Sequence, residues 1–314
     1  MTFSTSPRRM TALVAVAALI VAGTAGCARG ADASGNPKVV LAVSTLNNPF
    51  FVELRDGAQA AADEAGLDLF IVDAQNDSAT QADQLSTALS GGTQAVILNP
   101  VDSDAASSSV GALNGANIPV IAVDRTVNDA ALTSMVASDN VAGGTQAADE
   151  LAKSMGESGS IIVLQGVSGT SASRERGEGF DAGIKAYPNI TVIAKQTANF
   201  DRAEALDVTT NLLQAHSDVA GVFAENDEMA LGAIQALGSR AGTDVKVVGF
   251  DGTADGLAAI EEGTLVATIA QQPAKLGQLA IELAARIIAG ETVEQTVPVA
   301  VVSVTTDNVN DFAR

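Results

Sequence analysis

The stretch VVLAVSTLNNPFFVELRDGAQAAADEAGLDLFIV, residues 39–72, contains the unit from which the fold of the whole chain is predicted. The β-branched run 39–43 is typical of a buried strand, and the Ala-rich segment 56–65 favours a helix. The apolar run 67–72 predicts a second strand. A strand, a helix and another strand in this order form a βαβ unit, in which the two strands lie parallel.

The same alternation continues along the chain. Strand-like runs begin near residues 39, 67, 95 and 119, and again near 160, 190, 221 and 245. Their spacing of roughly 24 to 31 residues is the length of one βα unit, so each half of the chain holds four such units. A shorter run, 267–270, follows the second set. We therefore predict an α/β protein with two lobes, each a doubly wound parallel sheet with helices on both faces.

Composition agrees with this architecture and excludes one class of partner. Of the 314 residues, 47% are hydrophobic but only 3% are aromatic, so the cores must be built mainly from Ala, Val, Ile and Leu. The 37 acidic residues outnumber the 17 basic ones, which leaves a net charge of −20. Nucleic acid would repel such a chain, and no nucleic-acid partner is expected.

The first 27 residues have the features of an export signal. Arg8 and Arg9 precede an uncharged stretch, 10–26, which is shorter than a membrane span and ends in small residues. The sequence Thr24-Ala25-Gly26 then precedes Cys27, the only cysteine. This arrangement resembles a lipoprotein cleavage box, in which the cysteine becomes the acylated first residue of the mature protein, although an aliphatic residue is usual at Thr24.

We accordingly expect residues 1–27 to be a lipoprotein signal peptide and residues 28–37, which are small and polar, to be a tether. The chain would then be exported and anchored by lipid at the outer face of the cell membrane, or periplasmic if Cys27 is not acylated.

Polar and aromatic residues gather where the predicted strands end. In doubly wound sheets, ligands bind beyond the carboxyl ends of the strands. Asn, Asp, Arg, Gln and Phe residues occur at these ends, in segments 44–51, 124–125, 174–176, 199–201, 225–227, 249–252 and 271–273. Planar polar side chains pair with hydroxyl groups, and aromatic rings cover apolar C–H faces, so this set favours a sugar site.

Three of these segments carry a family resemblance. VSTLNNPFF (43–51), SASRERGEGF (171–180) and NDEMALGA (226–233) resemble the motifs of the D-ribose-binding members of the type I periplasmic binding proteins, which serve bacterial ABC importers. The likeness extends from about Val39 to Val302. The sugar-contacting residues that it implies are Ser44, Asn48, Phe50, Phe51, Asp124, Arg125, Arg176, Phe200, Asn226, Asp251 and Gln271. Glu225 and Gln272 depart from the family pattern outside this set.

The resemblance also implies how the two lobes are connected. We expect three crossings between them, near residues 138–139, 271–272 and 298–300. The N-terminal lobe would comprise residues 38–138 plus 272–299, and the C-terminal lobe residues 139–271 plus 300–314. Closure about this three-strand hinge would bury the sugar and present a closed rim to the membrane permease of an ABC importer. No cofactor is needed, and the chain would act as a monomer.

The charges of the implied site favour a neutral ligand and argue against catalysis. Asp124 and Asp251 are balanced by Arg125 and Arg176, so the site suits an uncharged ligand. The resemblance implies that this ligand is a sugar, D-ribose in particular. A carboxylate neutralised by arginine is poorly suited to general acid–base work. With one histidine and only the export-site cysteine, neither a His-based triad nor a typical zinc site can form, so no catalytic or metal residue is assigned.

Three alternatives come from other classes of protein. A repressor effector domain shares this fold, but the export signal argues against it. A sugar hydrolase or isomerase would require Asp124 and Asp251 to act as an acid–base pair. A binder of another sugar, such as allose, galactose or a furanose signal molecule, stays open because one pocket change can redirect sugar choice.

Overall fold

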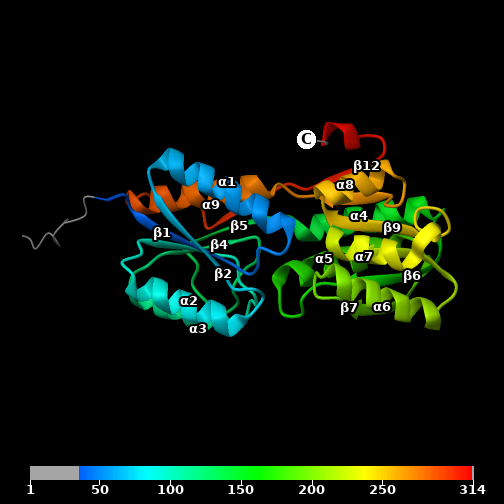
Figure 1. Ribbon diagram of the computed structural model, residues 1–314, viewed down its shortest axis with the longest axis horizontal. Coiled ribbons are helices and arrows are strands. Elements are labelled where there is room, and N and C mark those ends of the chain that lie inside the picture. Colours follow the sequence, from blue (N-terminus) through cyan, green and yellow to red (C-terminus); the bar gives the residue numbers. More distant parts are fainter. Residues whose placement is uncertain (1–34, 313–314) are drawn as a thin grey trace, which may run out of the picture. The chain divides into compact units, whose positions relative to one another are not determined.

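Two six-stranded sheets organise residues 35–312, the part of the chain that the computed structural model describes (Figure 1). The first sheet has the strand order β11-β5-β4-β3-β1-β2, and the second has the order β12-β10-β9-β8-β6-β7. The first comprises β1 (Lys38–Val43), β2 (Asp68–Asp73), β3 (Ala95–Leu98), β4 (Val120–Val123), β5 (Ser134–Ser138) and β11 (Thr296–Val299). The second comprises β6 (Ser158–Gln165), β7 (Asn189–Thr197), β8 (Val219–Ala224), β9 (Lys246–Asp251), β10 (Ala267–Ala270) and β12 (Val302–Thr305).

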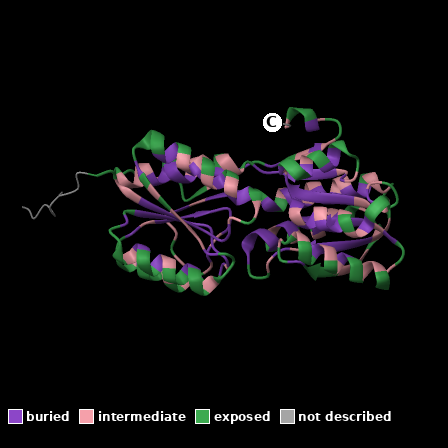
Figure 2. Cartoon of the chain, viewed as in Figure 1, coloured by how far each residue is buried: buried purple, intermediate pink, exposed green. Residues whose placement is uncertain are grey.

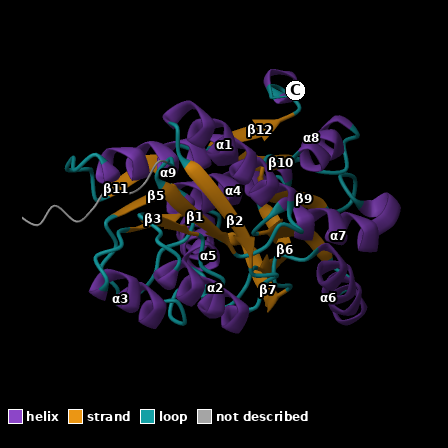
Figure 3. Cartoon of the chain, turned by 60° about the vertical axis from the view of Figure 1, so that its left-hand side comes forward, coloured by secondary structure: helices purple, strands orange, loops and turns teal. Residues whose placement is uncertain are grey.

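Helices cover the faces of each sheet. Those of the first sheet are α1 (Pro49–Ala65), α2 (Ser78–Ser90), α3 (Ser107–Gly115) and α9 (Pro273–Ile288). Those of the second are α4 (Asn140–Ser154), α5 (Ser171–Gly183), α6 (Arg202–Ala215), α7 (Asp227–Leu237) and α8 (Ala254–Glu261). Figure 3 shows the strands of the first sheet between α1 and α9 on one side and α2 and α3 on the other. We call each sheet with its helices a lobe, N-terminal for the first and C-terminal for the second.

The predicted α/β class with two parallel-sheet lobes is confirmed. Every strand pair is parallel except β10 with β12, which is antiparallel. Three strands went unpredicted: β5, β11 and β12. Each is only four or five residues long, and β11 contains Pro298, which an edge strand tolerates because it needs no ladder N–H on its free side.

The chain passes between the lobes three times. β5 ends in the first sheet at Ser138, and the next element, α4, packs on β8, β9 and β10 of the second. β10 ends at Ala270, and α9 then returns to pack on α1 and the first sheet. β11 and β12 belong to different sheets and are separated by residues 300–301 alone. These three connecting segments form the hinge.

Each lobe buries apolar layers on both faces of its sheet, and Figure 2 shows the strands buried and the outer helix faces exposed. Leu41, Ile97 and Ile121 are fully buried in the first sheet. The C-terminal lobe adds a stacked pair, Phe180 and Phe223, whose ring centroids lie 4.3 Å apart. Among residues 35–312, no helix is long and apolar enough to cross a membrane.

Candidate functional site

A cavity lies between the lobes at the carboxyl ends of their strands. It is lined by Asn48, Phe50, Phe51, Asp124, Arg125, Ala172, Arg176, Phe200, Asn226, Asp251 and Gln271. Ten of these residues are among the eleven that the sequence predicted, and the structure brings those ten together.

The aromatic wall from the N-terminal lobe depends on the start of α1. The Asn48 side chain caps this helix by accepting a 2.9 Å hydrogen bond from the backbone N–H of Phe50, and Pro49 occupies the first turn. The rings of Phe50 and Phe51 meet edge to face, with centroids 5.1 Å apart. Both rings also pack on the core of the lobe, which holds them rigidly at the cavity.

The charged pair of this lobe consists of consecutive residues at the end of β4. Asp124 has a φ of +66°, which turns the chain sharply and brings its Oδ2 within 3.5 Å of Arg125 Nε. Arg125 also donates to the carbonyl of Pro100 at 3.1 Å. Its guanidinium carbon lies 5.3 Å from the ring centroid of Phe51 and 5.5 Å from that of Phe200, so it contacts aromatic rings of both lobes.

The corresponding pair of the C-terminal lobe joins two distant elements. Arg176 on α5 lies 3.5 Å from the Oδ1 of Asp251, the last residue of β9. The register of β9 and β10 pairs Asp251 with Ala270, so Gln271 follows beside it and donates to the same Oδ1 at 2.7 Å. The guanidinium of Arg176 stacks on Phe250, 4.0 Å from its centroid.

Phe200 and Asn226 complete the C-terminal side. Phe200 has a φ of +58°. Its ring lies so close to the backbone that a Cβ at Gly166 would be only 2.0 Å from it. Asn226 caps α7 by accepting from Met229 N–H, and its Nδ2 donates to the carbonyl of Phe200 at 3.4 Å. A glycine is thus required at 166 for the ring to reach the cavity.

The charged side chains that line the cavity are buried, and their charges balance. Burial raises the pKa of Asp124 and of Asp251, and burial also lowers the pKa of Arg125. Among the described residues, three buried atoms of the lining have no hydrogen-bond partner: Asp124 Oδ1, Arg125 Nε and Gln271 Oε1. Two are acceptors and one is a donor, so a ligand with hydroxyl groups would satisfy all of them.

Two positions differ from the sequence prediction. Ser44 is buried at the end of β1 but is not among the lining side chains, and its backbone N–H donates to Asn99 Oδ1 at 3.1 Å. Ala172, in the first turn of α5, lines the cavity without having been predicted. A methyl group carries no recognisable chemistry, so only its place one turn before Arg176 could have indicated it.

The lobes also touch each other directly at the cavity. Thr126 N–H of the N-terminal lobe donates to Ser171 Oγ at 3.0 Å, and Ser171 N–H donates to Ser103 Oγ at 3.2 Å. Ser103 N–H donates to the carbonyl of Gly169 at 3.1 Å. We call these four residues the interlobe latch. Their contacts show that the lobes are closed over the cavity.

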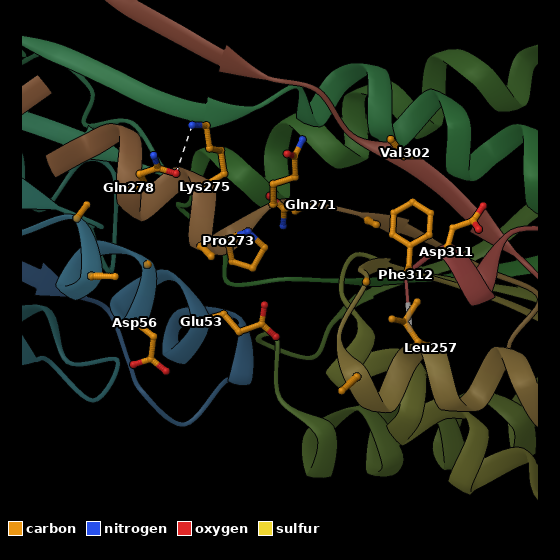
Figure 4. A pocket seen from close by; sticks show the side chains of 18 of the residues that line it. Glu53, Asp56, Leu257, Gln271, Pro273, Lys275, Gln278, Val302, Asp311 and Phe312 are labelled. Atoms are coloured by element: carbon orange, nitrogen blue, oxygen red, sulfur yellow. Dashed lines mark hydrogen bonds between the residues drawn. The ribbon is translucent and has the colours of Figure 1, made fainter. Parts of the chain in front are cut away.

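A wider groove lies next to the hinge, between α1, α8 and α9 (Figure 4). Glu53 and Asp56 of α1 face it, together with Pro273, Lys275 and Phe312. Gln271 is the one residue that lines both this groove and the cavity among those described. The groove is larger, but its charged side chains are exposed and Phe312 is the one aromatic residue among the described residues that line it. The cavity is therefore the better candidate site. Residues 35–312 contain no cluster of three His, Cys, Asp or Glu side chains that could hold a metal ion.

Comparison with known proteins places the chain in a family. The family described as "Periplasmic binding protein domain" matches residues 39–292, and the chain belongs to this family.

Curated relatives and a solved structure resemble the chain over most of its length. It is 47% identical over 284 residues to "Ribose import binding protein RbsB" of Escherichia coli (strain K12). The aligned region covers 90% of this chain and 96% of that protein. The protein of the same name from Bacillus subtilis (strain 168) is 46% identical over 84% of this chain and 87% of its own length. A solute binding protein of an ABC transporter from Bacillus halodurans, solved with myo-inositol, superposes with a TM-score of 0.84 at 33% identity, covering 89% of this chain and 98% of that one.

Proposed function

We propose that the chain is the extracytoplasmic solute-binding protein of an ABC sugar importer and that it binds D-ribose between its lobes. The observation that carries this proposal is the closed cavity, in which two balanced ion pairs and three phenylalanine rings surround buried donors and acceptors. Three of these polar atoms make no hydrogen bond to any described residue. The identity to ribose import binding proteins supports ribose as the sugar. The myo-inositol relative supports the alternative of another neutral ring polyol.

The proposed mechanism is recognition followed by closure. A sugar hydroxyl donates to Asp124 or Asp251 while accepting from a neighbouring arginine, which strengthens both hydrogen bonds in a dry site. The rings of Phe50, Phe51 and Phe200 cover the apolar faces of the sugar. The membrane permease recognises the closed conformation, and the sugar is released chemically unchanged.

Within this proposal the ten predicted lining residues bind the sugar, and Ser44 supports them from the end of β1. The proposed lobe boundaries are residues 38–138 plus 272–299 and residues 139–271 plus 300–314. The chain acts as a monomer and needs no cofactor, and neither carboxylate of the cavity serves as a catalytic acid or base.

Titration calorimetry against a panel of pentoses, hexoses and myo-inositol tests the proposal. D-ribose should bind with a dissociation constant of roughly 1 μM or tighter, corresponding to about 8 kcal/mol or more. Ribose at 100 times that constant should stabilise the protein by about 2.7 kcal/mol, seen as a higher melting temperature. A clear response to another sugar with none to millimolar ribose would reject the ribose assignment. Recovery of chemically altered sugar would reject the binding-only function.

Anchoring rests on residues outside those the structure describes, including Cys27. We propose that acylation of Cys27 holds the protein at the outer face of the cell membrane. A fatty-acid analogue should label the wild type but not Cys27→Ser, which should leave the membrane fraction or accumulate as precursor. Equal labelling of both forms would contradict the proposal.

A further inference from the structure

Two buried asparagines lie behind the cavity without lining it: Asn99 and Asn140. Asn99 directly follows β3, whose neighbours in the sheet are β1 and β4. Its Nδ2 donates to Asp124 Oδ2 at 3.1 Å and to the carbonyl of Val123 at 3.3 Å. Its Oδ1 accepts from Ser44 N–H at 3.1 Å. One amide thus joins the ends of three adjacent strands and holds one oxygen of the Asp124 carboxylate.

In the C-terminal lobe, Asn140 contacts a charged residue of the cavity from a different kind of element, a helix start. It is the first residue of α4, immediately after the first hinge crossing. Its Oδ1 accepts from Arg176 Nε at 2.9 Å, and its Nδ2 donates to Glu175 at 3.3 Å. The carbonyl of Glu225 accepts from Arg176 Nη1 at 2.6 Å. The guanidinium is therefore held along one edge by groups that do not themselves bind sugar in the proposed function.

Close packing of α4 on α5 makes this contact possible. A Cβ at Gly144 would lie 2.2 Å from the carbonyl oxygen of Arg176, and a Cβ at Gly179 would lie 2.1 Å from that of Val141. The two helices meet backbone to backbone at these glycines. Only at such a distance does the short side chain of Asn140 reach the guanidinium.

We propose that Asn99 and Asn140 are positioning residues for sugar binding, each orienting one charged side chain of the cavity. The inference rests on the proposed function. The two act in opposite chemical senses, because Asn99 donates to a carboxylate whereas Asn140 accepts from a guanidinium. With Oδ2 held, Asp124 keeps Oδ1 free for a sugar hydroxyl. Orientation before binding reduces the entropy lost when the complex forms.

The opposite senses predict opposite responses to the same substitution. Asn140→Asp keeps an acceptor for Arg176 and places its second oxygen against Glu175, which is partly exposed and does not line the cavity. It should therefore bind ribose within about fivefold of the wild type, whereas Asn140→Ala should bind roughly 10- to 100-fold more weakly. Asn99→Asp places a carboxylate against Asp124, so it should be weaker than Asn99→Ala, which itself should lose roughly tenfold. If the substitutions acted only by disturbing packing, the Asp and Ala variants would have the same order of ribose affinity at both positions.

Calorimetry of these four variants tests the inference, with Asn308→Ala as the matched control. Asn308 makes two comparable hydrogen bonds in the C-terminal lobe, to Thr305 N–H and to the carbonyl of Ser303, and is absent from the cavity lining. The control should bind as the wild type does. In an Arg176→Ala background, Asn140→Ala should cause less than about threefold further loss, because its target is gone.

The outcomes separate the two proposals. Failure of the wild type to bind any sugar of the panel would overturn the proposed function, and the inference with it. If the wild type binds but Asp and Ala variants rank alike at both positions, or Asn140→Ala binds normally, the inference is overturned alone. Melting temperatures of the sugar-free variants identify any loss of fold. If an alanine variant does not fold, comparison of Asn140→Asp with Asn99→Asp still decides, and equal affinities would reject the inference.

Discussion

The two lobes share one architecture but assemble their charged pairs in different ways. In the N-terminal lobe, Asp124 and Arg125 are neighbours in sequence, and one strand end with a φ of +66° brings them together. In the C-terminal lobe, Arg176 and Asp251 are 75 residues apart and come from α5 and β9. Both pairs have a closest distance of 3.5 Å. A local pair survives small movements of its surroundings, whereas a pair between distant elements depends on their packing.

The lobes also differ in the carboxyl groups that they bury. Beside Asp251, the C-terminal lobe buries Asp227 and Glu225, whereas Asp124 is the buried carboxyl of the described N-terminal lobe. Asp227 accepts from the N–H and hydroxyl of Thr253 and from the hydroxyl of Thr268, and burial raises its pKa. The C-terminal lobe should therefore be more sensitive both to packing and to pH.

The largest expected effect is on sugar affinity in Asp251→Ala. The substitution removes the partner of Arg176 and of Gln271 in a desolvated site, which costs on the order of 2–5 kcal/mol, or roughly 30- to several-thousand-fold in affinity. Calorimetry with ribose measures it, and Asp255→Ala, whose side chain is 62% exposed, is the control. Near-native affinity would show that Asp251 does not contact the sugar.

The next prediction concerns the pH dependence of stability. Burial raises the pKa of Glu225 from 4.5 to about 7. Between these values the folded protein keeps a proton that the unfolded chain releases, so the free energy of unfolding falls as pH rises through this window. In Glu225→Gln the free energy of unfolding should decrease less over this pH window than in the wild type, by on the order of 3 kcal/mol.

Denaturant unfolding from pH 4 to 8 measures the slopes. Glutamine suits the site, because Ser173 Oγ and Gly166 N–H both donate to the same oxygen, Oε2. The exposed Glu64 supplies the control Glu64→Gln, which should leave the profile unchanged. Parallel profiles for wild type and Glu225→Gln would contradict the prediction.

A smaller effect is expected from Gly144→Ala, which tests the packing that holds Arg176. The new methyl group would overlap the Arg176 carbonyl and force α4 from α5, at a cost of about 2 kcal/mol in stability and roughly tenfold in affinity. Gly111→Ala is the matched control, because nothing lies within 4 Å of a Cβ there on α3. That variant should be slightly more stable. Equal effects of Gly144→Ala and Gly111→Ala on stability and affinity would show that the distant pair Arg176–Asp251 does not depend on the packing of α4 on α5.

The smallest expected effect is that of Ser171→Ala, which removes the latch acceptor of Thr126 N–H. Loss of one such hydrogen bond costs about 1 kcal/mol, so ribose should bind roughly fivefold more weakly and dissociate faster. Stopped-flow dissociation measures it. Ser154→Ala, which affects only a local bond to the Leu151 carbonyl, should not change the rate. Unchanged dissociation in Ser171→Ala would show that the latch does not hold the lobes closed.

The two-lobe α/β fold and the region of the candidate site could be predicted from the amino-acid sequence. The regular recurrence of strand-like runs leaves little choice of architecture, because parallel strands need covering helices on both faces. Strand ends of such sheets converge, so residues such as Asp124 and Asp251 could be placed at one edge from their positions after strand-like runs. The family resemblance carried by motifs such as NDEMALGA then implied which side chains at this edge contact the ligand.

The buried groups behind the cavity could not be predicted from the sequence, because long-range packing brings them there. The edge strand β11 is four residues long and contains a proline, so its pairing depends on β5 rather than on its own pattern. The hydrogen bonds of Asn99 to Asp124, of Arg176 to Asn140 and of Thr126 to Ser171 join residues that lie 25, 36 and 45 positions apart. An asparagine or serine carries the same chemistry wherever it occurs. Only helix packing and lobe closure determine which partner comes within reach of a side chain that short.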